Sequence, residues 1–265
     1  MNGEVEGRGD LVAHVNELLA IDRVAKRFGD FAAVDGLTLS IPAGRLTAVI
    51  GPNGAGKTTL INLVTGALVP DAGELRFKGE AITKLPVHER IHKGLSRSFQ
   101  IMNVFARLSV LENILVPVLS RRGRTAKVHR ISSENEAIAE ARRILQEVGL
   151  GQEQDTPAGV LSHGDQRLLE LGIAIATGPE LCFLDEPFSG LTSIERGAVL
   201  ELIRKLSAER RTTFVIVEHD MDVVFALAEW IIVLNRGQLL AEGPPAAIRE
   251  HAGVREVYLG EGAPA

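Results

Sequence analysis

Short apolar runs and stretches of helical periodicity alternate along this chain of 265 residues. Apolar runs that end at glycine or proline predict strands, and the first third of the chain carries them at residues 18–26, 37–41, 46–50 and 74–78. Apolar residues at helical spacing predict helices over 88–94, 110–119 and 134–148. Strand patterns return at 181–184, 213–217 and 231–234, each after a segment with helical spacing.

This order of elements predicts an α/β protein. An N-terminal antiparallel β layer comes first, a helical subdomain is inserted at about residues 87–177, and a mainly parallel sheet with helices on it forms the core. We expect one domain over residues 18–260, with Gly243-Pro244-Pro245 marking the boundary before a short helical tail. Residues 1–17 are polar and are expected to be a mobile N-terminal tail, and 261–265 a C-terminal tail.

Composition narrows the possible functions. The formal charge of −5 provides no basic field for DNA or RNA, so we expect no nucleic-acid partner. The single cysteine, Cys182, excludes an internal disulfide and suits a reducing cytosol. No apolar run approaches the roughly 20 residues that span a bilayer, and the acidic start is not a signal peptide. We therefore expect a soluble globular protein that would need a partner to hold it at a membrane.

A phosphate-binding loop follows the predicted strand at 46–50. The stretch from Gly51 to Thr59 fits the pattern G-x-x-x-x-G-K-[ST], and a helix begins where the loop ends. Because this strand–loop–helix order is the required one, a chance glycine-rich turn is disfavoured, and a P-loop NTPase (RecA-like) core is predicted. Lys57 would reach the β- and γ-phosphates, and the Thr58 hydroxyl would bind Mg²⁺. The predicted nucleotide-binding residues here are Gly51, Asn53, Gly54, Ala55, Gly56, Lys57, Thr58 and Thr59.

Two adjacent carboxylates end the apolar strand at 181–184. A phosphoryl-transfer site needs one acid in the Mg²⁺ shell and another to orient the attacking water, so we assign Asp185 to the metal and Glu186 to the water. Two solvated acids at a strand end are the alternative, which Pro187 and the upstream phosphate loop disfavour.

A second helix start lies between the loop and the acids. Ser162 is a plausible N-cap for the helical pattern that follows, and free N–H groups at such a start suit an anion. Taken alone, an ordinary capped helix is the better interpretation. A second phosphate-facing helix start in the same chain shifts that balance towards a binding role.

Together these motifs resemble the nucleotide-binding subunits of ATP-binding cassette (ABC) transporters. Residues 51–59 resemble the Walker A motif, 161–166 the signature motif, 181–186 Walker B, and 189–192 the D-loop. Gln100 matches the Q-loop glutamine, His219 the switch histidine, and Phe28 the aromatic that stacks on adenine. The motifs stand in family order and the resemblance covers about residues 18–260.

The resemblance implies an ATPase in which two subunits, identical or related, enclose two ATP molecules with Mg²⁺. Ser162 and Gly164 of one subunit would complete the nucleotide site of the other. The resemblance gives catalytic roles to Glu186, His219, Gln100 and Lys57, and places Thr58, Gln100 and Asp185 at the metal. Without it, Gln100 would pass as a solvated loop amide and His219 as a strand-end histidine.

Three positions depart from the family pattern. His163 stands where a second signature glycine is usual, Asp165 follows Gly164 where glutamine is common, and Thr192 replaces the D-loop aspartate. Ser162 and Gly164 are kept, so ATP binding is still expected. The loss of the aspartate leaves open how the two sites communicate.

Residues outside the shared motifs resemble the importer branch for branched-chain and other hydrophobic amino acids. They include 97–100, 104–113, 218–224 and 254–260. Importers of urea and short amides are similar, and an exporter subunit stays an alternative. A soluble cassette ATPase of DNA repair is disfavoured, because neither a long coiled coil nor a basic surface is present.

The importer resemblance implies partners and a location. The implied partners are two permease subunits and a periplasmic or extracellular solute-binding protein. The implied location is a peripheral position at the cytoplasmic face of the inner membrane. Apolar side chains after Gln100 suggest a groove for a permease helix, although packing of the helical insert explains them equally well. They are Ile101, Met102, Val104, Phe105 and Leu108.

Overall fold

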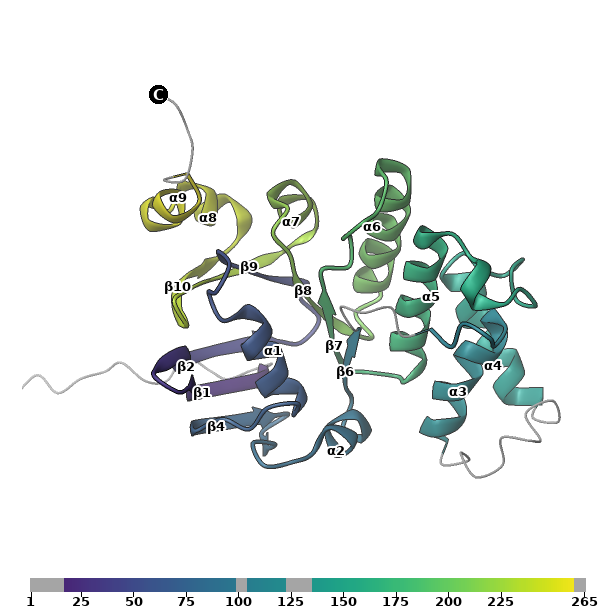
Figure 1. The fold of residues 1–265 in the computed structure, drawn as a ribbon, viewed down its shortest axis with the longest axis horizontal. Coiled ribbons are helices and arrows are strands. Elements are labelled where there is room, and N and C mark those ends of the chain that lie inside the picture. Colours follow the sequence, from purple (N-terminus) through teal and green to yellow (C-terminus); the bar gives the residue numbers. More distant parts are fainter. Residues whose placement is uncertain (1–16, 99–103, 123–134, 260–265) are drawn as a thin grey trace, which may run out of the picture.

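Two sheets and a set of helices make up the computed structural model, which describes residues 17–98, 104–122 and 135–259 (Figure 1). The strands are β1 (Glu17–Phe28), β2 (Phe31–Pro42), β3 (Thr47–Ile50), β4 (Ala72–Phe77), β5 (Glu80–Ala81), β6 (Leu95–Ser98), β7 (Leu181–Asp185), β8 (Thr213–Val217), β9 (Trp230–Asn235) and β10 (Gln238–Gly243). The helices are α1 (Lys57–Thr65), α2 (Val87–His92), α3 (Val110–Arg121), α4 (Asn135–Glu147), the 3₁₀ turn η2 (Ala158–Val160), α5 (His163–Ala176), α6 (Ser193–Ala208), α7 (Met221–Leu227), α8 (Pro245–Glu250) and α9 (Ala252–Leu259).

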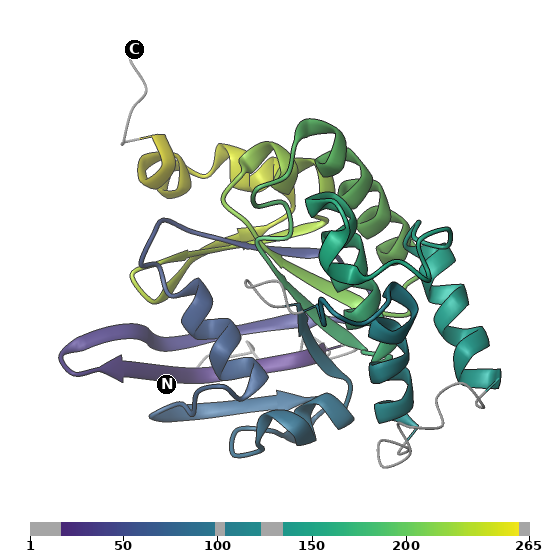
Figure 2. The same ribbon diagram turned by 45° about the vertical axis from the view of Figure 1, so that its right-hand side comes forward.

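The larger sheet has the strand order β10-β9-β3-β8-β7-β6. The strands from β9 to β6 run parallel, and β10 returns antiparallel to β9 as a hairpin. The smaller sheet is antiparallel, with the order β2-β1-β4-β5, and lies below the larger one in Figure 2. This confirms the predicted α/β class with a mainly parallel core sheet and an N-terminal antiparallel layer.

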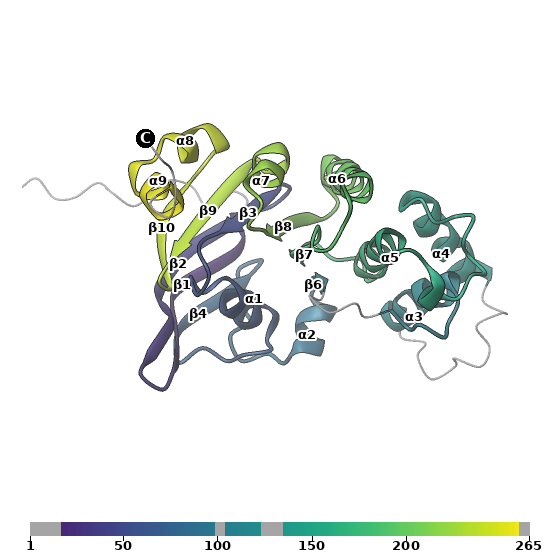
Figure 3. The ribbon, with the colours of Figure 1, turned by 45° about the horizontal axis from the view of Figure 1, so that its top comes forward.

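A separate hydrophobic core packs against each face of the parallel sheet. Along β7, Cys182 and Leu184 pack with helices α3 to α7, whereas Leu181 and Phe183 pack with α1 and the antiparallel sheet. Figure 3 shows α6 and α7 over the first face and α1 beside β4. Because a parallel strand is buried on both faces, it reads as an unbroken apolar run, which is why β7 and β8 could be predicted.

Strand β6 was not predicted. Of its residues, only Leu95 is a strong apolar strand former, and Ser96, Arg97 and Ser98 carry polar side chains. Pairing with β7 nevertheless places it at the edge of the parallel sheet, with Leu95 opposite Leu181 and Ser98 opposite Leu184. The predicted helical insert at about 87–177 therefore contains one strand of the core sheet. The bounds of that insert, and the tails at 1–17 and 261–265, stay predictions.

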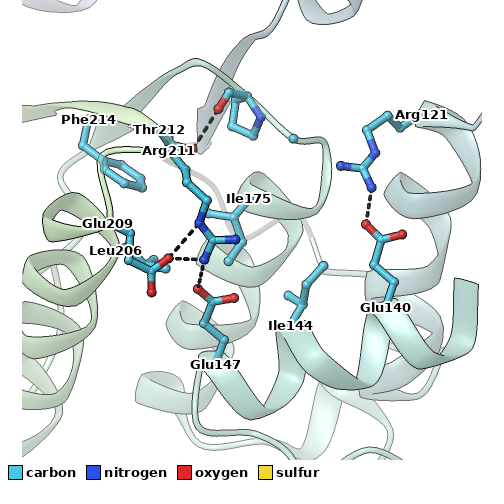
Figure 4. A pocket seen from close by; sticks show the side chains of 12 residues that line it. Arg121, Glu140, Ile144, Glu147, Ile175, Leu206, Glu209, Arg211, Thr212 and Phe214 are labelled. Atoms are coloured by element: carbon cyan, nitrogen blue, oxygen red, sulfur yellow. Dashed lines mark hydrogen bonds and ion pairs between the residues drawn. The ribbon is translucent and has the colours of Figure 1, made fainter. Parts of the chain in front are cut away.

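Helices α3, α4 and α5 pack together at the end of the molecule away from β1 and β2 (Figure 1). Between these helices and the end of α6 lies a pocket of about 280 Å³, with apolar walls and a charged rim (Figure 4). Arg211, before β8, points to Glu147 of α4 at 3.4 Å and also pairs with Glu209. The ion pair between Arg211 and Glu147 thus joins the α3–α5 helices to the parallel sheet. No helix in the described part of the chain is long and apolar enough to cross a membrane.

A buried arginine donates hydrogen bonds to the carbonyl groups at the C-terminal end of α1. The Arg90 side chain from α2 donates to the carbonyl oxygens of Leu63 and Val64, both at 2.6 Å, in the last turn of α1. It also donates to the carbonyls of Leu85 at 2.9 Å and Thr83 at 3.0 Å. Burial lowers the pKa of this guanidinium. Arg90 therefore fixes the helix that follows the phosphate loop.

Replacing Arg90 by methionine should lower the free energy of unfolding by about 3 kcal/mol or more. Methionine fills similar space but leaves several buried carbonyl groups without a donor. Urea denaturation would measure the loss. Arg76→Met is the matched control, because Arg76 is exposed on β4 and forms an ion pair with the nearby Glu74 at the surface, so its loss should cost less than about 1 kcal/mol. Equal effects of the two substitutions would contradict the role of Arg90.

Candidate functional site

The parallel order of β3, β8 and β7 brings three loops to one edge of the sheet. Val217 at the end of β8 pairs with Val49 on one side and with Asp185 on the other. The segments that follow these strands are the loop from Gly51, the residues from Glu186, and the residues from Glu218. Sequence positions more than a hundred residues apart therefore meet at the carboxyl ends of neighbouring strands.

The loop after β3 is held against two other strands by its glycines. A Cβ on Gly51 would lie 2.3 Å from the carbonyl oxygen of Leu234 in β9, and a Cβ on Gly56 would lie 2.4 Å from that of Ala33 in β2. Gly237, in the β9–β10 turn, donates its N–H to the Ala55 carbonyl at 3.0 Å. Only glycine fits at Gly51 and Gly56, so β2 and β9 set the shape of the loop.

Helix α1 begins at Lys57 without any side chain to cap it. The N–H groups of such a first turn, with the positive end of the helix dipole, form a site for an anion. Thr58 and Thr59 lie in this turn, and Thr58, Asn53 and Gly54 are exposed beside it. The sequence-predicted phosphate loop thus has the geometry that phosphate binding requires.

The Lys57 amino group lies over its own loop. Its Nζ donates to the carbonyl oxygens of Gly51 at 2.6 Å and Pro52 at 3.0 Å. Burial lowers the pKa of Lys57, and the negative charges of Glu186 and Asp185 oppose this shift. The cation and the two acids therefore share one electrostatic environment. Their roles in phosphoryl transfer stay a prediction.

The two acids at the end of β7 differ in their surroundings. Asp185 is buried and its Oδ2 accepts a hydrogen bond from Arg97 at 2.7 Å. Glu186 is partly exposed, has a left-handed backbone with φ of 48°, and donates its N–H to the Val217 carbonyl at 2.9 Å. A non-glycine residue in that conformation is strained, and such strain is held by the surrounding structure. The turn aims Glu186 away from the core and towards His219.

His219 lies close to Glu186. Its Nδ1 is 3.7 Å from Oε1 of Glu186, and the histidine side chain is 68% exposed, so the pair faces the open side of the site. Beside them is Glu218, a carboxylate that the sequence analysis did not single out. It is buried, accepts the N–H groups of Phe188 and His219, and has its pKa raised by burial. An acid directly after the buried strand β8 was the only sequence signal for it.

Ser162 caps α5 as predicted, since its Oγ accepts the N–H of Asp165 at 3.1 Å. The Gly164 N–H donates to Oε1 of Glu195 at 2.9 Å, whereas Oε2 of Glu195 accepts the N–H of Thr192 at 2.9 Å and its hydroxyl at 2.8 Å. The hydrogen bonds from Thr192, followed by that from Gly164, lower the pKa of Glu195. A carboxylate of the same subunit therefore occupies this helix start.

The unusual His163 is accommodated within the same cluster. A Cβ on Gly190 would lie 3.1 Å from Cε1 of His163, so the ring packs closely on the D-loop. Its Nδ1 is buried and has no hydrogen-bond partner among the described residues. Two of the three departures from the family pattern, His163 and Thr192, thus lie in one contact between the starts of α5 and α6.

The structure does not bring every predicted site residue together. Among the described residues, no hydrogen bond joins Ser162 or Gly164 to the loop at 51–59, and Gln100 lies outside the described residues. Phe28 is half exposed at the end of β1, opposite the equally exposed Phe31. Since Ala33 on the same hairpin contacts Gly56, this aromatic pair lies on the strands that border the loop.

Tyr258 of α9 is a further neighbour of the loop that the sequence analysis did not assign to the site. Burial raises the pKa of its phenol, and the backbone of Gly51 opposes this rise. Although the two groups interact, the buried hydroxyl forms no well-aligned hydrogen bond with the described residues. The C-terminal helical tail therefore reaches the first glycine of the loop.

Comparison with known proteins identifies the family. A protein-family model described as "ABC transporter" matches residues 34–189, more than half of the chain. The chain belongs to the ABC transporter family. A second model, described as "Branched-chain amino acid ATP-binding cassette transporter", matches residues 238–264 of this cassette. The resemblance noted in the sequence is confirmed, and the chain is a nucleotide-binding ATPase cassette.

Curated relatives span nearly the whole cassette. It is 38% identical over 252 residues to the high-affinity branched-chain amino acid transport ATP-binding protein BraF of Pseudomonas aeruginosa, covering 92% of this chain and 98% of the relative. It is 35% identical over 252 residues, with the same coverage, to the corresponding LivG protein of Escherichia coli.

Solved structures share the fold of the cassette. A nucleotide-free ATP-binding cassette of an ABC transporter superposes with a TM-score of 0.80 at 32% identity, covering 91% of this chain and 98% of that one. An ADP-bound cassette of an ABC transporter gives the same score and identity, covering 92% and 99%. A dimeric cassette in a post-hydrolysis state with ADP and phosphate gives 0.73 at 26% identity, covering 86% and 98%.

Gly51→Ala should destabilise the cassette by about 1–3 kcal/mol and weaken nucleotide binding, because its methyl group would overlap a backbone oxygen of β9 that no side-chain rotation can move. Urea denaturation and binding of a fluorescent ADP would measure the two effects. Gly197→Ala in α6 is the control. Its methyl group would meet nothing within 4 Å, so this substitution should stabilise the helix by about 0.5–1 kcal/mol. A Gly51→Ala protein with normal stability and affinity would contradict the steric argument.

Proposed function

We propose that this cassette is the ATP-hydrolysing subunit of an importer for branched-chain amino acids. The observation that carries the proposal is the match of residues 238–264 to a model of branched-chain amino acid cassettes, in addition to the general match over 34–189. Relatives named for branched-chain amino acid transport, 35% and 38% identical over 92% of the chain, support the same choice over urea or amide import.

In this proposal ATP lies with its phosphates on the first turn of α1. The backbone N–H groups of residues 53–59 and the Lys57 amino group bind the β- and γ-phosphates, and Phe28 stacks on the adenine. To do so, Lys57 exchanges the carbonyls of Gly51 and Pro52 for phosphate oxygens. The exposed position of Asn53, Gly54 and Thr58 supports this pose, because those atoms face the side from which a ligand would approach.

The donor set suits Mg²⁺ that arrives with ATP. Among the described residues no cluster of three or more histidine, cysteine or acidic side chains forms a metal site of its own. One buried carboxylate, Asp185, and one hydroxyl, Thr58, match Mg²⁺, which keeps several waters and shares its remaining sites with phosphates. When bound, Mg²⁺ neutralises phosphate charge. We propose Thr58, Asp185 and Gln100 as the residues that hold it.

Hydrolysis then depends on positioning. Glu186 accepts a hydrogen bond from the attacking water and orients it towards the γ-phosphate, and His219, 3.7 Å from Glu186, interacts with the γ-phosphate and fixes that carboxylate. The strained turn at Glu186 supports this role, because it projects the side chain from a strand end that hydrogen bonds hold in place. Gln100 links the site to the segment that follows β6.

A second cassette completes each site in this proposal. Ser162 and Gly164 of one subunit bind the γ-phosphate held by the other, whether the partner is a second copy or a paralogue. The dimeric post-hydrolysis structure, 26% identical, supports such a pairing. Since Glu195 occupies the Gly164 N–H within one subunit, dimer closure exchanges that carboxylate for phosphate.

Two permease subunits bind the cassette dimer at an apolar groove. The groove is about 650 Å³, lies between α2, β6 and α5, and includes Val104 and Phe105, as the sequence suggested. Ile101 and Met102 lie outside the described residues, and Leu108 is not part of the lining. The groove follows β6, the strand that leads to Gln100, so a permease helix seated there would sense the nucleotide site.

Bound to the permeases in this way, the cassette would lie peripherally at the cytoplasmic face of the inner membrane. A solute-binding protein would complete the importer.

Glu186→Gln should lower ATP turnover by about 100-fold or more and accumulate ATP-bound dimers, because binding groups remain while the water loses its acceptor. Turnover and size-exclusion chromatography with ATP would measure this. Glu229→Gln is the control, since Glu229 is exposed at the start of β9, at the opposite edge of the sheet, and should change neither. Normal turnover in the Glu186→Gln protein would remove Glu186 from its proposed role.

The transporter complex, purified from its host through a tag on this chain, should hydrolyse ATP faster with leucine and its solute-binding protein than with urea.

The same purified complex tests whether the permeases bind at the groove. Ile91→Glu places a charge on the apolar wall and should reduce recovery of the permeases several-fold without changing nucleotide binding. Val69→Glu, at an apolar position that is also exposed but lies outside the groove, is the control. Stimulation by urea alone, or full permease recovery with Ile91→Glu, would contradict the solute or the docking proposal respectively.

A further inference from the structure

Arg97 joins the two halves of the nucleotide site from β6, a strand to which the sequence assigned no part of the site. On β6 it lies opposite Phe183 of β7, and its side chain is only 13% exposed. One guanidinium nitrogen donates to Oδ2 of Asp185 at 2.7 Å and another to Oδ1 of Asn62 at 2.5 Å. Asn62 lies on α1, the helix that begins with Lys57 and Thr58. A single side chain therefore connects the carboxylate after β7 with the helix of the phosphate loop.

The hydrogen bonds of Asp185 are divided between its two oxygens. Asp185 is 3% exposed, and Arg97 occupies Oδ2, whereas Oδ1 receives no hydrogen bond from the described residues. A guanidinium presents its donors in a rigid planar fork, so holding Asn62 and Asp185 at once fixes the plane of the fork and, with it, the carboxylate. One oxygen of the acid is thereby committed to the protein, and the other is left for a ligand.

The geometry around Arg97 is not the one that maximises stability. Its Nε is buried and has no hydrogen-bond partner among the described residues. A buried donor without an acceptor is unfavourable, and a buried ion pair often stabilises a protein no more than apolar residues of the same volume. A largely buried arginine kept under these conditions is better explained by what it does for Asp185 than by folding alone.

We propose that Arg97 is a positioning residue for the metal carboxylate, fixing Asp185 relative to α1 so that Mg²⁺ binds with the nucleotide. This inference rests on the proposed function of the site. A small cation such as Mg²⁺ demands near-ideal placement of its ligands, and outer partners that orient a ligand are commonly needed for full metal affinity.

The test compares nucleotide affinity with and without Mg²⁺. Binding of a fluorescent ADP is measured in EDTA and across a Mg²⁺ titration for the wild-type chain and for Arg97→Met. We expect the Mg²⁺ concentration that gives half of its full effect on ADP binding to rise about 10- to 100-fold in the variant. The affinity for ADP in EDTA should stay within about twofold of the wild-type value. Arg97→Lys, which keeps the charge but not the fork, should lie between them. A melting curve for each variant establishes that it is folded.

A double-mutant cycle separates positioning from a structural role. Asp185→Asn should weaken the Mg²⁺ effect by itself, and adding Arg97→Met should weaken it no further, because Arg97 acts through Asp185. Asn62→Ala should produce a smaller loss in the same direction, and it tests the proposal without removing a buried charge. Unchanged Mg²⁺ dependence in both Arg97→Met and Asn62→Ala, or fully additive losses in the double variant, would overturn the inference.

Failure of the underlying function would be seen in the wild-type chain. If that chain bound no nucleotide, the proposed function would fail before any variant was measured. If it bound ADP with no Mg²⁺ effect, the metal assignment and the role of Arg97 would both be wrong. Normal Mg²⁺-dependent binding in the wild type with no change in the variants would contradict the role of Arg97 alone.

Discussion

The site depends on one constraint, the parallel pairing of β3, β8 and β7 in that order. Parallel strands end at the same edge of a sheet, so the loops that follow them converge whatever their separation in sequence. The phosphate loop, the two acids after β7, and His219 after β8 are each short segments fixed to a buried strand end. Were β7 and β8 to exchange places, β8 and the His219 that follows it would move a strand width away from Lys57, and the loops would no longer meet in this arrangement.

The sequence predicted those features that depend on local pattern. The loop from Gly51 to Thr59, the buried strand before Asp185 and the N-cap at Ser162 are each determined by adjacent residues, and all have the expected local structure. Strand β6 and the roles of Glu195 and Glu218 were missed, since they depend on partners distant in the chain. Arg97 is the clearest case: nothing near it in sequence indicates that it bonds to residues 35 positions before and 88 positions after it.

Two of the three departures from the family pattern, His163 and Thr192, belong to one structural unit. Sequence comparison treats His163 and Thr192 as separate losses, yet they lie on either side of a single contact between α5 and α6. Glu195 caps α6 through Thr192 and also binds the N–H of Gly164, so the D-loop region communicates with the signature helix through a carboxylate within the subunit. Threonine is, like aspartate, a favoured N-cap residue, which explains why the helix start tolerates the exchange.

The carbonyl oxygens packed against Gly51 and Gly56 have a thermodynamic consequence. Because Leu234 and Ala33 belong to strands, the loop between them loses its conformational freedom when the chain folds. An incoming nucleotide therefore meets donors that are already ordered, and little of the interaction energy is lost to immobilising the backbone. Affinity for phosphate thus depends on the two surrounding strands. Changes in β2 or β9, although remote from the ligand, would alter the affinity for the nucleotide.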